Sequence, residues 1–236
     1  MKRSFKKAVQ YQEGRKVRGG RQARAMGKRS SYGRQLEEEI WQNAEVDALS
    51  RLAGVGVRVP DTYFCIDGVL LMELVSDEDG NVAPQLGHVV FSEEQAIEQY
   101  KLMIHYIKLM LCAGIIHGDL SEFNVLVDNN GPVIIDLPQA VNASANNSAQ
   151  AMFARDVNNI RRYYGEFAPS ILKTQYAKEM WALFEEANLT PNSTLTGEFE
   201  DSDELADVDS ILDEIQAAEY EEFDRLERIK NADDDE

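Results

Sequence analysis

Residues 116–136, IHGDLSEFNVLVDNNGPVIID, contain three polar side chains that could hold a metal-bound phosphate group. Asp119 lies five residues before Asn124, and Asp136 follows Asn124 by twelve. Phosphoryl transfer requires an in-line γ-phosphate, a metal ion that neutralises its charge, and an oriented acceptor hydroxyl. Magnesium takes oxygen ligands, usually one or two of them from protein. The pattern therefore predicts that Asp119 accepts the acceptor's proton and that Asn124 and Asp136 bind the metal ion.

These side chains need a scaffold that brings them together. Two apolar runs, FNVLV at 123–127 and PVIID at 132–136, flank the turn residues DNNG. A hairpin returns its second strand to the start of its first, so this one would place Asp136 beside Asn124. Taken singly, an Asp can cap a helix and an Asn can supply a turn. Their combination with two apolar strands is much more specific to phosphoryl transfer.

His117 precedes this cluster and is a candidate general base. Its neighbours Ile115 and Ile116 are apolar, which favours a packed side chain that braces the loop backbone. We therefore predict the bracing role. His88 and His105 belong to no ligand pattern, and we assign them no role.

Asp67 and Gly68 separate another pair of apolar runs, TYFCI and VLLMELV. An Asp-Gly pair in this setting is a strong hairpin signal. We therefore predict strands over residues 62–66 and 69–75. Short strands among longer helical segments predict an α+β fold.

Helical periodicity covers most of the remaining chain. Ser92 and Gln95 match a capping box, so a helix is expected to begin there and run to about Cys112, before Gly114. Its predicted core positions are Ala96, Ile97, Tyr100, Ile104, Ile107, Leu109 and Leu111. Other predicted helices cover residues 36–52, which Gly54 and Gly56 end, 148–165 and 169–187.

The formal net charge of −18 is unevenly distributed. Residues 1–34 contain twelve Lys and Arg and one acid, whereas residues 198–236 contain eighteen acids and three bases. The basic arm 1–34 is suited to a phosphate-rich partner such as RNA or nucleotide, or is a solvated flexible face. Apolar residues recur at helical spacing in the acidic tail, which predicts an amphipathic helix packed on the protein's own body or on a partner.

Cysteine usage and hydropathy predict a cytoplasmic protein without membrane contact. Cys65 and Cys112 are the two cysteines, and they fit no metal-ligand pattern, which suggests a reduced compartment. No apolar stretch approaches the roughly 20 residues that span a bilayer. The basic start lacks the apolar centre of a signal peptide.

The motif HGDLSEFN resembles the catalytic loop of the protein-kinase-like superfamily. Its DLSEFN wording, and IIDLPQ where other kinases have DFG, are similar to the RIO family of atypical serine/threonine kinases. The resemblance extends through WQNAEVDAL, RVP and LLMELV, and covers roughly residues 1–195. It implies a protein-kinase-like fold with a reduced N-lobe at 1–75, a flexible basic loop at 18–34, a mostly helical C-lobe at 76–195 and an acidic tail at 196–236.

The resemblance also implies roles for the polar cluster. Asp119 would be the catalytic aspartate, and Asn124 and Asp136 would bind both the nucleotide and its metal ion. The expected cofactors are ATP and Mg2+, with Mn2+ as an alternative ion. The expected partners are a protein substrate with Ser or Thr and, through the arm 1–34, a ribosome- or RNA-associated partner.

Residues outside the cluster receive roles by the same resemblance. Glu45 would be the helix C glutamate that pairs with the strand-three lysine. Glu73 and Val75 would lie at the hinge, where backbone groups bind adenine. Ser30 and Ser31, in the flexible loop, are candidate autophosphorylation sites.

The sequence departs from the family pattern at its start. Family members place a glycine-containing phosphate loop and a strand-three lysine before the segment that matches RSFKKAVQYQEGRK, which here begins at Arg3. We expect an upstream truncation and low activity of the chain as given.

Three functions are compatible with these residues. The leading hypothesis is ATP-dependent phosphorylation of protein Ser/Thr, or ATP hydrolysis used as a conformational switch, and RIO relatives are linked with small-ribosomal-subunit maturation. Aminoglycoside- and choline-type phosphotransferases share the HGD-x4-N pattern, so a small-molecule kinase is an alternative. The third is a non-catalytic nucleotide-binding module, which the missing lysine favours.

Overall fold

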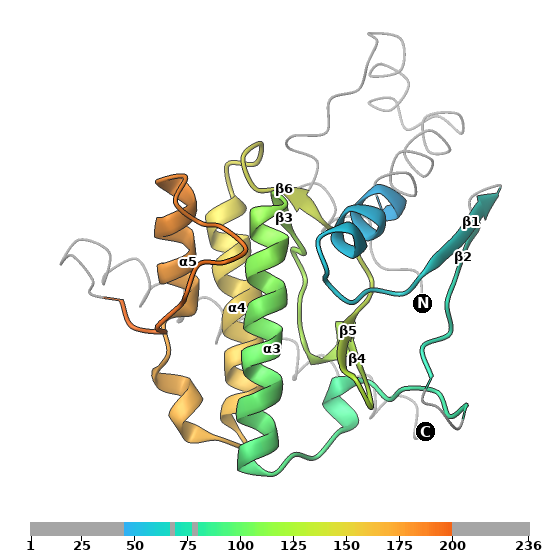
Figure 1. The fold of residues 1–236 in the computed structure, drawn as a ribbon, viewed down its shortest axis with the longest axis horizontal. Coiled ribbons are helices and arrows are strands. Elements are labelled where there is room, and N and C mark those ends of the chain that lie inside the picture. Colours follow the sequence, from blue (N-terminus) through green and yellow to red (C-terminus); the bar gives the residue numbers. More distant parts are fainter. Residues whose placement is uncertain (1–44, 67–68, 77–79, 200–236) are drawn as a thin grey trace, which may run out of the picture. The chain divides into compact units, whose positions relative to one another are not determined.

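Short antiparallel strand pairs alternate with longer helices in the computed structural model, which describes residues 45–66, 69–76 and 80–199 (Figure 1). The labelled helices are α3 (Glu93–Cys112), α4 (Ala149–Gly165) and α5 (Tyr176–Glu185), and a further helix covers residues 45–54. The strands are β1 (Thr62–Ile66), β2 (Val69–Met72), β3 (Ile115–Ile116), β4 (Val125–Asp128), β5 (Gly131–Ile134) and β6 (Val141–Asn142). Short 3-10 helices cover Leu86–His88, Glu122–Asn124 and Pro169–Lys173. The predicted α+β class is confirmed.

Helix α3 forms as its capping box predicts. The Gln95 amide donates to the Ser92 hydroxyl over 3.2 Å, and the Ser92 amide donates to the Gln95 side-chain oxygen over 2.9 Å. These two bonds satisfy donors that would otherwise be unpaired in the first helical turn. The helix stops at Cys112, and Gly114 takes a left-handed φ of 71°. Both predicted ends of this helix are therefore confirmed.

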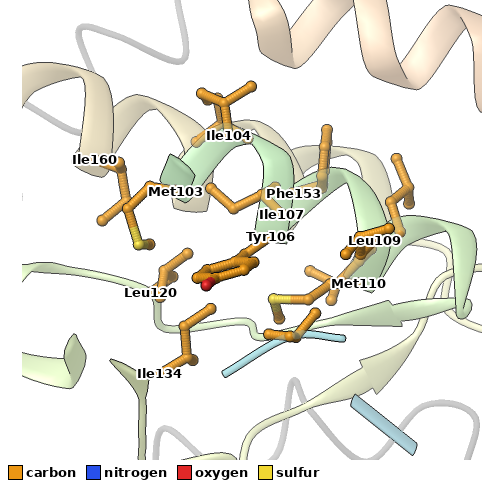
Figure 2. Close-up of a cluster of buried hydrophobic side chains, with 14 of the residues drawn as sticks. Met103, Ile104, Tyr106, Ile107, Leu109, Met110, Leu120, Ile134, Phe153 and Ile160 are labelled. Atoms are coloured by element: carbon orange, nitrogen blue, oxygen red, sulfur yellow. The ribbon is translucent and has the colours of Figure 1, made fainter. Parts of the chain in front are cut away.

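The main hydrophobic core lies between α3, α4, α5 and the strands that follow α3. Of the predicted α3 positions, only Ile97 is half-buried, and the other six are buried. Figure 2 shows α3 side chains, including Met103 and Tyr106, facing Leu120 and Ile134. The prediction missed Met103, Tyr106 and Met110, because their spacing widens the apolar face beyond one stripe.

The two predicted hairpins both form; β1 has its predicted bounds, and the other three strands are shorter than expected. Strand β2 ends at Met72 rather than residue 75. Beyond it the Glu73 amide still donates to the Asp61 carbonyl over 2.8 Å, but the Asp61 amide donates to the Glu73 carboxylate over 3.1 Å. Strand β4 starts at Val125, after the 3-10 turn that contains Asn124. Strand β5 ends at Ile134, and the left-handed φ of 64° at Asp136 interrupts extended backbone.

Two further features differ from the sequence-based expectations. The β3–β6 pair was not predicted, because strands of two residues carry no periodic signal. The helix expected over 169–187 is divided at Thr174, which has extended backbone (φ −77°, ψ 145°). Pro169 opens a 3-10 helix before this break, and α5 begins after it.

Residues 45–54 and the helices after β2 contribute side chains to one core, and the described residues up to Glu198 form one unit. The helix predicted over 36–52 ends at Gly54, as expected, within its described part. The arm 1–34 with its loop 18–34, Ser30 and Ser31, and the tail beyond residue 199 lie outside the described residues. The boundaries 1–75, 76–195 and 196–236 stay predictions. Among the described helices, none is long and apolar enough to cross a membrane.

Candidate active site

Hydrogen bonds link Asp119 to Asn124, and link Asn124 to the residue before Asp136. The Asn124 side-chain amide donates to the Asp119 carbonyl over 2.7 Å. The Ile135 amide donates to the Asn124 carbonyl over 3.0 Å, continuing the β4–β5 ladder in which Val125 pairs with Ile134. Asp136 follows Ile135 directly, so the hairpin returns it beside Asn124.

The hydrogen bond from Asn124 fixes the orientation of a buried side chain that is 6% exposed. Because its nitrogen is directed at the Asp119 carbonyl, its oxygen Oδ1 is turned the other way. An amide oxygen and the Asp136 carboxylate are the kinds of ligand that magnesium prefers. This donor set fits a magnesium ion completed by phosphate and water.

Glu45 lies close enough to Asp136 for the two charges to interact. Burial raises the pKa of the Glu45 carboxyl, and the negative charge of Asp136 raises it further. A cation between two such carboxylates would relieve their repulsion. The structure thus brings the predicted helix C glutamate to the same place as the predicted metal ligand.

Gln139 also reaches the site, although sequence reasoning did not select it. Its side-chain amide donates to the Asp119 carboxylate oxygen Oδ2 over 3.1 Å. Gln139 belongs to the IIDLPQ segment, so it comes from the same strand end as Asp136. It therefore joins Asp119 to the segment that carries a metal ligand.

Side chains of helix α4 hold the loop around Asp119 through hydrogen bonds to its backbone. The Asp156 carboxylate accepts the Gly118 amide over 2.7 Å and the Leu120 amide over 3.0 Å. The Asn159 side chain donates to the Leu120 carbonyl over 3.0 Å, and the Arg155 guanidinium donates to the Gly118 carbonyl. The residues on both sides of Asp119 are thereby fixed to one helix.

Asp156 is almost completely buried, at 2% exposure. Burial raises the pKa of its carboxyl to about 6, although His117, the two backbone amides and Arg155 act in the opposite direction. Sequence analysis overlooked Asp156, yet a signal was available. An Asp placed between Phe153, Val157 and Ile160 interrupts the apolar stripe of a helix.

His117 is 1% exposed, and its Nε2 donates to the Ile135 carbonyl over 2.9 Å. Because a carbonyl only accepts, the proton must be on Nε2. Its Nδ1 has no hydrogen-bond partner among the described residues. A buried ring that links the catalytic loop to β5 supports the bracing interpretation over the general-base one.

Gly118 must be a glycine where the chain enters the loop. Its φ is 80°, and an added Cβ would lie 2.9 Å from the Gln139 carbonyl oxygen and 2.7 Å from Met152. This backbone oxygen cannot move aside without a cost in free energy, because the Gln139 side chain is hydrogen-bonded to Asp119. These two segments can approach so closely only because residue 118 is a glycine and has no side chain.

The two predicted hinge residues lie where β2 leads into the bridge between Ser76 and Val82. Val75 is 4% exposed and packs with Ala83 and Val133, and its carbonyl accepts the Ala83 amide over 3.0 Å. The Glu73 carboxylate accepts the Asp61 amide over 3.1 Å, so it supports the connection. Val75 thus contacts strand β5, which leads to Asp136. Adenine binding at these residues stays a prediction.

Among the described residues, no three His, Cys, Asp or Glu side chains are arranged to hold a metal ion by themselves. A divalent ion here would need Asn124, a residue type outside that set, and oxygens from a nucleotide. This is the donor arrangement expected where a metal ion accompanies a phosphate group. The assembled groups can orient a hydroxyl at Asp119 and neutralise phosphate charge nearby.

Comparisons with known proteins identify the family of this chain. A family model of the RIO domain matches residues 1–178. The chain belongs to the RIO family. The catalytic-loop resemblance to this family is thereby confirmed.

Curated RIO relatives are similar at moderate identity. The chain is 35% identical to the RIO-type serine/threonine-protein kinase Rio1 of Haloferax volcanii over 124 residues, which are 52% of this chain and 41% of that protein. It is 28% identical to the serine/threonine-protein kinase RIO1 of Caenorhabditis elegans over 166 residues, 65% of this chain and 32% of that protein. The RIO chain thus spans less than half the length of these relatives.

A solved structure confirms the protein-kinase-like fold. The crystal structure of the Rio2 kinase–ADP/Mg2+–phosphoaspartate complex from Chaetomium thermophilum matches with a TM-score of 0.50 and 25% sequence identity. The match covers 65% of this chain and 46% of that one.

Proposed function

We propose that the protein is a RIO-type serine/threonine kinase that transfers the γ-phosphate of ATP to Ser or Thr of a protein, or uses ATP turnover as a conformational switch. The observation that carries this proposal is the linked geometry of Asp119, Asn124 and Ile135. It supports a metal ligand pair directly beside a candidate base. The names of the RIO relatives support the same reaction class.

Each residue has a distinct task in this proposal. Asp119 accepts the proton of the acceptor hydroxyl, and Gln139 orients its carboxylate through Oδ2. Asn124 and Asp136 hold the metal ion, which when bound neutralises the phosphate charge. Glu45 is close enough to Asp136 for their charges to interact, and it positions a cationic group that contacts the phosphates.

Burial of the surrounding loop contributes preorganisation. Asp156 and Asn159 fix Gly118 and Leu120, so Asp119 approaches a substrate with little freedom to rotate away. Fixed geometry lowers the entropic part of the barrier, because the reacting groups need not be ordered during the reaction.

The nucleotide and ion are proposed by chemistry and by likeness. The Rio2 structure was solved with ADP and Mg2+. We propose ATP and Mg2+ for this chain, with Mn2+ as an alternative that accepts the same oxygen ligands. We also propose Glu73 and Val75 as the adenine-binding hinge, and Ser30 and Ser31 as autophosphorylation sites.

The proposed partners follow from charge. The arm 1–34, with twelve bases, suits an RNA- or ribosome-associated partner. We propose a cytoplasmic setting, consistent with two cysteines that form no ligand pattern.

Transfer of γ-labelled phosphate tests the reaction directly. The protein is incubated with Mg2+ and γ-labelled ATP, with and without a casein-like acceptor, and compared with Asp119→Asn and with Asp61→Asn as a control at an exposed carboxylate. Label on protein that Asp119→Asn loses and Asp61→Asn keeps supports the proposal. Equal labelling of the wild type and Asp119→Asn contradicts it.

The chemistry of the label distinguishes kinase from switch. A phosphate ester on Ser or Thr survives hydroxylamine, whereas an acyl phosphate on an aspartate is cleaved by it. The name of the Rio2 complex includes a phosphoaspartate, and this applies to that protein. Hydroxylamine-stable transfer to the acceptor supports the kinase activity, and release of phosphate without stable label supports the switch.

A further inference from the structure

Arg58 joins the segment after helix 45–54 to the turn of the β4–β5 hairpin, which we call the catalytic hairpin. This turn is the end of the hairpin farther from Asn124 and Asp136. Its guanidinium contacts both Asp128 carboxylate oxygens, over 2.8 Å and 2.6 Å. The same side chain donates to the Gly131 carbonyl over 3.0 Å. The side chains of Arg58 and Asp128 are 30% and 6% exposed, so much of this contact is shielded from water.

The backbone of Arg58 makes a second connection to the same hairpin. The Ile134 amide donates to the Arg58 carbonyl over 2.9 Å, which places this residue alongside β5. Arg58 is therefore attached to both the turn and the outer edge of the hairpin. A bidentate guanidinium–carboxylate pair resists rotation, because two parallel bonds must break together.

The two charges stabilise one another in the folded state. The hydrogen bond to Arg58 lowers the pKa of the Asp128 carboxyl, and the hydrogen bond to Asp128 raises that of the guanidinium. Both directions agree with a pair that stays ionised. The pair gives the hairpin turn a charged anchor.

Arg58 connects the chain segments that carry two parts of the candidate site. Glu45 begins the described part of helix 45–54, and Arg58 follows four residues after its end. Asn124 and Asp136 flank the other end of the hairpin that Arg58 holds. The bonds of Arg58 to β4 and β5 thus join the packing of Leu49, Leu52 and Val57 in holding helix 45–54 against the core.

We propose that Arg58 is a positioning residue for phosphoryl transfer, which sets the location of Glu45 relative to the metal ligands through Asp128 and the hairpin turn. This inference rests on the proposed function. Because the Asp128 side chain is almost fully buried, loss of Arg58 also lowers stability, so the test below separates stability from catalysis. The contact affects catalysis by holding the catalytic groups in place, because small displacements of such groups reduce rates strongly.

The test measures kcat and KM for ATP in a series of variants. Arg58→Gln removes the charge, and Arg58→Lys retains it but loses the bidentate contact. Arg58→Asp combined with Asp128→Arg reverses the pair. Arg162→Gln, at an exposed position on α4, is the matched control. Circular dichroism and thermal unfolding of every variant verify that the fold is intact.

The inference predicts that Arg58→Gln lowers kcat about tenfold or more, with a much smaller change in KM for ATP. Arg58→Lys and the reversed pair should recover part of the loss, and Arg162→Gln should match the wild type. A merely structural role would instead lower the melting temperature without this split or rescue.

Failures of the two proposals are distinguishable. Unchanged kcat in Arg58→Gln, while Asp119→Asn eliminates transfer, overturns the positioning role and leaves the kinase proposal standing. Transfer that Asp119→Asn retains at the wild-type level overturns the proposed function and this inference with it.

Discussion

Two hairpins with similar sequence signals have contrasting environments in this protein. Both β1–β2 and β4–β5 consist of apolar runs that flank turn residues, and both pair antiparallel. In β4–β5, Val125 and Ile134 are fully buried. In β1–β2, Phe64 is 53% exposed and Val69 is 67% exposed. A hairpin pattern thus predicts pairing but does not predict what the paired strands contact.

Edge contacts separate the two hairpins further. The β4–β5 pair receives the Arg58 carbonyl on one edge, and the Val127 amide donates to the Pro84 carbonyl on the other, over 2.9 Å. Figure 1 shows β1 and β2 extending away from α3, α4 and α5. Catalytic groups must be held in fixed positions, which requires a scaffold with little conformational freedom. The buried hairpin, with hydrogen bonds on both edges, is the one that carries the candidate ligands.

The largest expected difference comes from truncating the buried strand. Ile134→Ala should lower the free energy of unfolding by about 4 kcal/mol, because it removes apolar contacts and leaves a cavity. Leu71→Ala is the control in the β1–β2 hairpin, which we call the outer hairpin. Leu71 is 44% exposed, so this substitution should lower the free energy of unfolding far less. Urea denaturation measures both. Equal costs would show that the two hairpins are equally packed in solution.

Asp156 tests how strongly the loop before β4 is anchored. Its folded-state pKa is about 6, above the ordinary 3.8, so its contribution to stability is present below about pH 4 and is lost as pH rises through about 6. The stability advantage of wild type over Asp156→Asn should shrink by about 3 kcal/mol between about pH 4 and about pH 8.

Denaturation curves of both proteins across this pH range make the measurement. Asp47→Asn, at a side chain that is 67% exposed, controls for general charge effects. A difference between wild type and Asp156→Asn that stays constant with pH would contradict a buried carboxyl with a raised pKa.

Substitution of Gly131 tests the turn of the catalytic hairpin. Its φ is 112°, and an added Cβ would lie 2.9 Å from Leu102, so Gly131→Ala should lower the free energy of unfolding by about 1–2 kcal/mol. Gly54→Ala is the matched control, since no atom lies within 4 Å of its added Cβ and its φ is not left-handed. It should be neutral or slightly stabilising. The prediction is wrong if both substitutions have the same effect.

The smallest effect is expected on the outer hairpin. Phe64→Ser should change the free energy of unfolding by less than about 0.5 kcal/mol, because the ring is already half in water. Chemical denaturation with tryptophan fluorescence can resolve this. A loss above about 1 kcal/mol would indicate that another surface covers this face in solution.

The motif residues could be predicted from sequence because they are close along the chain. Asp119 and Asn124 share one loop, and a single hairpin returns the chain to Asp136. The helix capped at Ser92 was equally accessible, since its signal lies within four residues. Local chemistry determines such features.

The supporting residues could not be predicted by spacing alone. Asp156 lies 37 residues after Asp119, and only the packing of α4 against the loop reveals that they are neighbours. Gln139 required the geometry of the chain after Asp136. Arg58 and Asp128 are 70 residues apart, and their pairing depends on the backbone of Arg58 lying alongside β5.

Magnesium-dependent nucleotide binding tests the central claim most directly. Calorimetric titration of ADP is carried out with Mg2+ and with a chelator, on wild type, Asp136→Asn and Asp47→Asn. We predict that Mg2+ tightens binding to the wild type and to Asp47→Asn by about tenfold, and that Asp136→Asn loses this gain. The same magnesium dependence in Asp136→Asn as in the wild type would contradict the proposed metal site.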